Sequence, residues 1–365
     1  MAHRCISRPP PHCPHPGCDS RTGSRPWRFK KKGFFFRDVP PFRIQRYLCH
    51  HCGRSFSSQT FSTTYWLKRN DLLEPLFHRL VGGACLRQIS REFGLAHSTV
   101  QRQMNRLGRH CLLFHESLRP RKGAPREPLV LDGFRTFEHS QYWPFDLNLL
   151  IGPSHYVYGF SDAELRRSGS MRPSQKEKRA RLEARHGRPD PQATRKSVQE
   201  LVGRIVPPGA RATIRSDEHK AYPRALRGLA NRRFRHERTS SRMGRTARNP
   251  LFPVNLADLL LRHSSANHKR ETIAFSKRRQ GALYQAAIWL VWRNYVKSRS
   301  ENRGDDPPAV ALGLIAKRLA VREILRTRLF PERVKLGPWL TRCYEGRIPT
   351  RRLPRNRVHQ PVFAR

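Results

Sequence analysis

The 365-residue sequence carries 73 lysines and arginines against 27 aspartates and glutamates, which gives a formal net charge of +46. A surface so one-sided attracts polyanions, so nucleic acid is the expected partner. The longest apolar runs, such as GALYQAAIWLVW at 281–292, are too short to cross a bilayer, and MAHRCISRPPPHC lacks the apolar segment of a signal peptide. We therefore expect a cytoplasmic protein, not bound to a membrane, with more than one folding unit.

Four cysteines near the start form two close pairs, in CPHPGC and CHHCGRSF. Two such turns can present four thiolates to one tetrahedral Zn²⁺, and the basic and apolar residues between them are typical of short strands. The spacing predicts a DNA-binding zinc ribbon over residues 1–62. The expected ligands of its structural zinc are Cys13, Cys18, Cys49 and Cys52, with His12, His15, His50 and His51 leaving the exact set open. The residues expected to pack its small core are Phe34, Phe35, Phe36, Phe42 and Tyr47.

Residues 63–117 repeat apolar positions with helical period and break at two glycine turns. The segment LRQISREFGLAHSTVQRQMNRLGRH has the pattern of a helix-turn-helix, with a second helix near residues 97–107. Val100, Met104 and Leu107 share the face that we expect to pack inward. The polar side chains left facing outward suit base edges and phosphates in the major groove, and they are His97, Ser98, Gln101, Arg102 and Asn105. The alternative is a plain three-helix unit with a solvated polar face.

A Pro- and charge-rich linker at 118–127 leads into a β-rich region. The runs EPLVLDGFRTFE, WPFDLNLLIG and SHYVYGFSDAEL read as three strands, TRKSVQELVGRIV as an amphipathic helix, and ARATIRSDEHKAYPRAL as a strand followed by a helix. This order is that of the ribonuclease-H-like fold. We therefore predict a multidomain α+β protein whose mixed α/β catalytic domain spans 128–300, with an extended or flexible insertion near 166–192.

Two acids of this region lie where strands end or turn, Asp132 in VLDGF and Asp217 in IRSDEH. In-line cutting and rejoining of a phosphodiester uses two Mg²⁺ or Mn²⁺ ions about 3.5–4 Å apart. Such hard cations take oxygen ligands. We expect both acids to be catalytic metal ligands, although each alone is as typical of a turn.

The chain resembles the DDE-type transposases of bacterial insertion sequences, which belong to the retroviral-integrase superfamily. The resemblance runs from CPHPGC to about residue 330 and rests on the order of the cysteine pairs, the helix-turn-helix, VLDGF, IRSDEHKAYP, HKRETIAFSKRRQGALYQAAIWLVWRNYV and PPAVALGLIAKRLAVREIL. It implies divalent-metal-dependent cleavage and transfer of double-stranded DNA at the terminal repeats of an element. It also implies a nucleoid-associated bacterial enzyme that works as a homodimer or larger assembly.

The family's third acid, usually Glu, falls on or near Asn255 in this sequence, with Arg262 seven residues later. Asp258 lies one helical turn on and shares that face, with Arg262 at i+4, so we favour it as the third acid. Glu271, followed by Arg278 seven residues later, is the alternative, and an inactive site is another.

Basic residues around this helical tract are expected to hold DNA phosphates, and they include Arg262, Lys269 and Arg278. Beyond it we predict a helical segment at 301–340 and a disordered basic tail at 341–365. The runner-up function is a catalytically inactive or domesticated DNA-binding regulator, and a basic RNA-binding structural protein ranks third.

Overall fold

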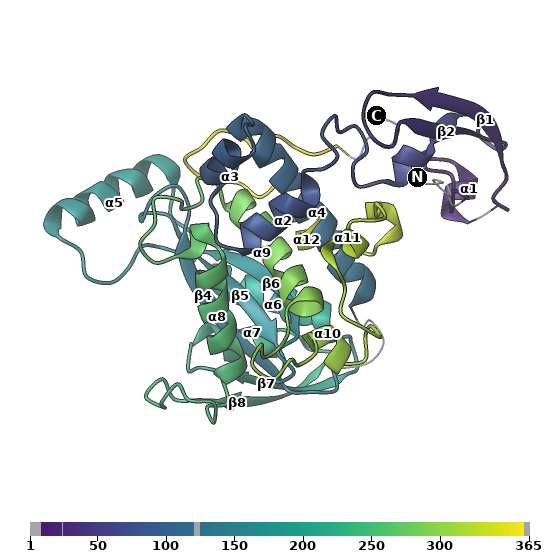
Figure 1. The fold of residues 1–365 in the computed structure, drawn as a ribbon. Helices are drawn as coiled ribbons and strands as arrows, with labels where there is room; N and C mark the ends of the chain where they lie inside the picture. Colours follow the sequence, from purple (N-terminus) through teal and green to yellow (C-terminus); the bar gives the residue numbers. More distant parts are fainter. Residues whose placement is uncertain (1–8, 24, 120–124, 361–365) are drawn as a thin grey trace.

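The computed structural model describes residues 9–23, 25–119 and 125–360, and over these residues the chain is a mixed α+β protein with two sheets. The α+β class is therefore confirmed. A small amino-terminal module lies beside a larger body built on a five-stranded sheet (Figure 1). Within the described ranges, no helix combines the length and apolar character needed to cross a bilayer.

The amino-terminal module is a three-stranded antiparallel sheet in the order β1-β2-β3, preceded by one short helix and followed by another. Its elements are α1 (Asp19–Thr22), β1 (Phe29–Phe36), β2 (Arg43–Cys49), β3 (Ser55–Ser57) and the 3₁₀ helix η1 (Ser58–Phe61). Its core holds the clustered cysteines with Tyr47 and Phe56.

Tyr47 is buried as predicted, but the expectation for the other four core aromatics of this module is wrong. The residues that are exposed instead are Phe34, Phe35, Phe36 and Phe42. The small core is already filled around Phe56 by Trp27, Phe29 and Phe61. The edge strand β1 is exposed from Lys30 onward, so its aromatic end has no layer to pack against.

Three helices follow the module, namely α2 (Leu73–Val81), α3 (Leu86–Glu92) and α4 (His97–Leu118). Val100, Met104 and Leu107 are buried in the same core as the main sheet, so their inward face is confirmed. The helix α4 continues to Leu118 instead of ending near residue 107. Its second half is largely buried and α4 packs against α9 (Arg279–Val291), which stabilises the extra turns.

The main sheet has the strand order β6-β5-β4-β7-β8. Its strands are β4 (Leu129–Phe137), β5 (Pro144–Ile151), β6 (Val157–Glu164), β7 (Arg211–Ser216) and β8 (Arg233–Arg238). β4, β5 and β6 form an antiparallel meander, whereas β7 pairs parallel with both β4 and β8. The connection from β6 to β7 carries α6 (Ala193–Ile205), which packs on β5 and β6, and α7 (Ala221–Arg227) follows β7.

Two further long helices complete the body. α8 (Phe252–Ser264) packs on β4 and β5, and α9 is buried on nearly every side, as an apolar helix in a core must be. The remaining short elements are η2 (Ala266–His268), the π-helical turn η3 (Trp292–Val296), α10 (Pro308–Ala311), α11 (Val321–Ile324), η4 (Pro331–Arg333) and α12 (Pro338–Tyr344).

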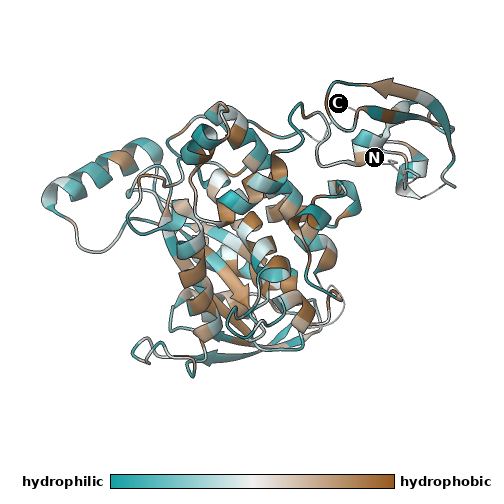
Figure 2. Cartoon of the chain, viewed as in Figure 1, coloured by the Kyte–Doolittle hydropathy of each residue, from teal (hydrophilic) through white to brown (hydrophobic). Residues whose placement is uncertain are grey.

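The segment expected to be an extended or flexible insertion contains a helix, α5 (Pro173–His186), which projects from the body (Figure 1). It buries no residue and its surface is mainly hydrophilic (Figure 2). The helix is rich in alanine, glutamate, lysine and arginine, which favour helix even where no other element packs against it. Ion pairs at i,i+4 add to this, as between Glu177 and Arg181.

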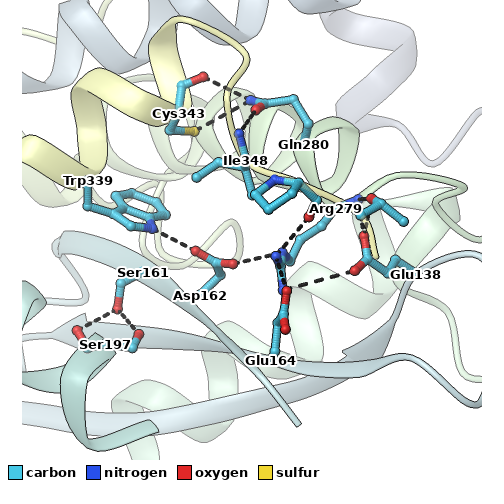
Figure 3. Close-up of polar contacts among 12 residues, drawn as sticks. Glu138, Ser161, Asp162, Glu164, Ser197, Arg279, Gln280, Trp339, Cys343 and Ile348 are labelled. Carbon is cyan, nitrogen blue, oxygen red and sulfur yellow. Dashed lines mark hydrogen bonds and ion pairs between the residues drawn. The ribbon is translucent and has the colours of Figure 1, made fainter. Parts of the chain in front are cut away.

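The prediction of a disordered tail is wrong for residues 345–360. This segment lies against the body. Arg279 on α9 is 3% exposed and pairs with Asp162 at 2.9 Å and Glu164 at 2.6 Å, while its backbone amide donates to Glu138 (Figure 3). The tail joins this group, with Arg351 at 2.7 Å from Glu164. The last five residues, 361–365, lie outside the described part of the chain.

We expect Arg279→Met to lower the free energy of unfolding by about 3–5 kcal/mol, because it leaves buried carboxylates without their cation. The loss should shrink in acid, where those carboxylates become protonated. Urea denaturation at several pH values measures it. Arg278→Met is the matched control, since Arg278 donates to the Pro354 carbonyl and its loss should cost about 1 kcal/mol or less. Equal losses for the two variants would show that the buried ion pairs are not what holds this region.

Candidate active site and metal centre

The four cysteines of the amino-terminal module converge on one point. The Sγ atoms of Cys13 and Cys52 lie 3.8 Å apart, as do those of Cys18 and Cys49, and all four lie within 4.8 Å of one another. A tetrahedral Zn²⁺ with Zn–S bonds of about 2.3 Å places its sulfurs about 3.8 Å apart. The cluster therefore fits a structural zinc ion.

None of the four neighbouring histidines joins this cluster in the described structure, and two of them make other polar contacts. His15 Nε2 lies 3.2 Å from the Ser55 carbonyl oxygen, and His51 Nε2 lies 3.2 Å from an Asp19 carboxylate oxygen. In the described parts of the chain, the four cysteines are the one group of three or more potential ligands brought this close together.

Replacing Cys49 by Ser should reduce the zinc content of the purified protein from about one ion per chain to near zero, since three thiolates close the shell poorly. The three-stranded module should lose its protection from proteolysis while the larger core keeps its own. Zinc release measured with a colorimetric chelator tests this. Cys85→Ser is the control, because Cys85 lies outside the cluster. Retention of zinc in the Cys49 variant would exclude this ligand set.

Strand register places the first two predicted acids side by side. Leu131 on β4 pairs with Ser216 on the parallel strand β7, so Asp132 and Asp217 each come one residue later on neighbouring strands. Such strands run about 4.8 Å apart. Asp217 also accepts a hydrogen bond of 2.9 Å from the His219 backbone amide, so it forms the turn as well as standing next to Asp132.

The third acid favoured from the sequence, Asp258, lies in α8, the helix that packs on β4 and β5. Its Oδ1 atom is buried and has no hydrogen-bond partner in the described structure. Asn255, one turn earlier, is half-buried, and Glu271 lies beyond the helix and is exposed. The structure thus brings Asp258 to the sheet and leaves Glu271 at the surface.

The three acids influence one another's charge. Burial raises the pKa of Asp132 to about 6, against the Gly133 amide that holds it down, and the nearby Asp217 carboxylate raises it further. Burial likewise raises the pKa of Asp258 to about 8, with the Asp132 carboxylate as the next cause, while Arg262 and Arg245 oppose the shift. Asp132, Asp217 and Asp258 are each half-buried. Raised pKa values such as those of Asp132 and Asp258 are found more often at functional sites.

The carboxylates are spaced more widely than the ligands of a single ion. No three of the described acids bring oxygen atoms within 4.8 Å of one another. Within the described residues, the acids therefore do not form a preassembled cluster of metal ligands.

Sequence reasoning missed a fourth acid, Asp146 on β5. It is 4% exposed, pairs with Arg135 at 3.0 Å, and its carboxylate would lie 3.3 Å from a Cβ atom at Gly133. Glycine next to Asp132 thus leaves room for a second carboxylate. The available signal was an acid inside the apolar strand FDLNLLI, where an unpaired charge is costly.

The predicted DNA-contacting residues lie in two places. Those on the first half of α4 are exposed or half-buried, with Gln101 donating to Asn105 at 2.9 Å, and the full set is His97, Ser98, Gln101, Arg102 and Asn105. Near α8, Lys269 is exposed. Arg262 donates to the His268 carbonyl at 3.1 Å and lies over the Phe134 ring, and Arg278 donates to the Pro354 carbonyl at 2.6 Å.

No protein-family model matches this chain, and no curated protein sequence matches it.

The raised pKa of Asp258 predicts a pH-dependent stability difference for Asp258→Asn. The folded protein holds this proton up to about pH 8, whereas an unfolded Asp releases it near 4, so the wild-type carboxylate costs stability increasingly as pH rises between these values. In that window, the free energy of unfolding of the variant should rise relative to that of the wild type by up to about 1.4 kcal/mol per pH unit. Urea denaturation without added Mg²⁺ or Mn²⁺ measures the difference.

The exposed Glu271 supplies the control for this measurement. Glu271→Gln should leave the pH dependence of stability unchanged. A flat difference between wild type and Asp258→Asn across pH 5–8 would contradict the burial of a strained carboxylate at this position.

Proposed function

We propose that the protein is a DDE-type DNA transposase that cleaves and transfers DNA strands at the ends of an insertion sequence. The observation that supports the proposal is the proximity of three acids around the central strand β4. Asp132 lies on β4, Asp217 directly follows the parallel neighbour β7, and Asp258 lies on α8, close enough for the Asp132 carboxylate to raise its pKa.

The strand order supports this proposal. An antiparallel meander whose first strand pairs parallel with a fourth strand and, through it, with a fifth is the arrangement of ribonuclease-H-like domains. Fold alone does not define an activity, so the acids carry the functional argument.

In this proposal Asp132, Asp217 and Asp258 hold two Mg²⁺ or Mn²⁺ ions. The ions supply activation of the attacking hydroxyl and stabilisation of the leaving oxygen. Asp132, on the central strand β4, would be one of the residues that hold the ions. Asp146, held by Arg135, adds negative charge to the same site.

DNA contacts in this proposal come from several surfaces. The zinc-ribbon module and the exposed side of α4 bind the terminal repeats, and the phosphates near the acids meet Arg262, Lys269 and Arg278. The net charge of +46 makes such binding strong and salt-dependent. Joining two element ends requires a homodimer or larger assembly at the bacterial nucleoid.

The competing function is a DNA-binding regulator with an inactive domain. One observation favours it, namely that the half-buried Asn255 stands where the family carries its third acid. The two functions differ in whether DNA strands are cut, which an activity measurement decides.

Purified protein should nick labelled DNA carrying the ends of its own element when Mg²⁺ or Mn²⁺ is added. Asp132→Asn, Asp217→Asn and Asp258→Asn should each reduce the cleavage rate by at least about 100-fold, because each removes a charged metal ligand. Glu271→Gln should cleave within about 2-fold of wild type. All variants should bind the DNA as tightly as wild type.

The result assigns the function either way. Cleavage that survives Asp132→Asn would exclude this active site. Binding without any metal-dependent cleavage by the wild type would favour the regulator.

A further inference from the structure

The amino-terminal module has a cavity of about 400 Å³ that neither the zinc cluster nor the acids use. It opens between the sheet and the segment that follows η1. Its lining includes Phe35, Arg37, Arg46, Gln59, Tyr65 and Trp66. Its volume lies within the range of small-ligand sites, about 300–1,000 Å³.

Aromatic rings line this cavity and remain in contact with solvent. Trp66 is 69% exposed and Phe35 is 39% exposed, although burial of either would be favourable. Tyr65 lies edge-on to Trp66, with ring centroids 6.0 Å apart, and the Arg328 guanidinium lies over the Tyr65 ring. Arg328 therefore supports the Tyr65 side of the cavity, while the Trp66 ring is accessible to solvent.

The backbone at Trp66 is strained. Its φ of 64° lies in the left-handed region, which is unusual for a bulky residue. Two backbone hydrogen bonds hold this turn, from Tyr65 to Ser62 at 3.1 Å and from Leu67 to Thr64 at 2.9 Å. A turn that exposes a large aromatic ring at a conformational cost is typical of a binding site.

One buried polar atom of the cavity lining has no partner. Gln59 is 8% exposed, and its Oε1 atom has no hydrogen-bond partner within the described residues. A buried amide oxygen without a partner costs free energy that a ligand can recover. Arg37 donates to backbone carbonyls of Val39 and Pro40, and neither Arg37 nor Arg46 pairs with an acid in the described ranges.

We propose that this cavity holds one unpaired nucleotide of a DNA strand, with its base stacked on Trp66 and its phosphate facing Arg37 and Arg46. The choice of DNA rests on the proposed function, and the size, aromatic walls and positive charge come from the cavity itself. Gln59 can meet the hydrogen-bonding edge of the base, since an amide both donates and accepts. Stacking on aromatic side chains with arginines at the backbone is how proteins bind unpaired nucleotides.

The charge around the cavity favours this occupant over an apolar peptide. Lys30, Lys31 and Lys32 are exposed on the adjoining strand β1, and the Arg43 guanidinium lies 3.6 Å from the Phe34 ring centroid. A paired duplex base is already stacked between its neighbours, so the cavity suits a base that has left the helix or a single-stranded end.

The test uses the zinc-loaded full-length protein and short fluorescent oligonucleotides, single-stranded or duplex, with binding measured by anisotropy. Trp66→Ala should weaken single-strand binding by about 5- to 150-fold, the range that corresponds to the loss of one stacked base, and leave duplex binding within about 2-fold. Trp66→Phe, which keeps a ring, should stay within about 3-fold of wild type. Gln59→Leu should change the relative affinities for the four homopolymers.

Phe36→Ala is the matched control, because Phe36 is 74% exposed and adjoins Phe35 but does not line the cavity. It should bind single strands as wild type does. Equal losses for Trp66→Ala and Phe36→Ala, an unchanged Trp66→Ala affinity, or equal losses for single strand and duplex would each overturn the proposal. Zinc content verifies that every variant keeps the folded module.

This outcome is independent of the catalytic proposal. Asp132→Asn should abolish cleavage and leave single-strand affinity unchanged. Loss of the nucleotide-site proposal would leave metal-dependent cleavage unaffected. Absence of cleavage would likewise leave a measured effect of Trp66→Ala on single-strand binding intact.

Discussion

The parallel pairing of β4 with β7 is the interaction on which the site depends. Its register sets Leu131 beside Ser216. Asp132 and Asp217, the next residue on each chain segment, therefore lie near each other. Leu129, Val130 and Leu131 are all fully buried, so both faces of β4 are covered at this point and apolar packing holds the strand in place. Hydrophobic packing thus offsets the repulsion between carboxylates that would otherwise move apart.

The same core explains why the helical segment is not a freely attached DNA-binding unit. The second half of α4 packs on α9, and both belong to one hydrophobic cluster with the main sheet. The polar side of the first half of α4 is therefore held in a fixed relation to the acids. In the function that we propose, this rigidity would keep the DNA contacts in register with the acids, because misplacement by about 1 Å is costly in catalysis.

Much of this architecture could be predicted from periodicity and spacing. The inward face of α4 and the zinc-type cysteine pairs follow from local patterns, and so do the three strands of the meander. The order of the tail at 345–360 could not be predicted from local patterns. This segment is rich in arginine and proline, and it is ordered because it contacts Glu138 and Glu164, which are distant in sequence.

Asp146 was overlooked for a related reason. Its role depends on a cross-strand neighbour, because the cavity left by Gly133 exists only once β4 and β5 are paired. The exposure of the β1 phenylalanines has the opposite cause. Apolar composition favours burial, but a three-stranded sheet built around four cysteines has too little interior to cover every aromatic residue on its edge strand.

The exposed aromatics and the buried acids are two departures from the rule that apolar groups are inside and charges outside. Each costs stability, and each lies where the surrounding structure is well fixed, at the strained turn of Trp66 and on the central strand β4. Departures of this kind persist when they serve binding or chemistry. In a chain with 46 more positive than negative side chains, these half-buried acids are poorly explained as surface charge. The exposed aromatics beside arginines that pair with no acid in the described ranges are poorly explained as packing. That contrast is the physical reason why we propose that the carboxylates bind metal and that the aromatic cavity binds a nucleotide.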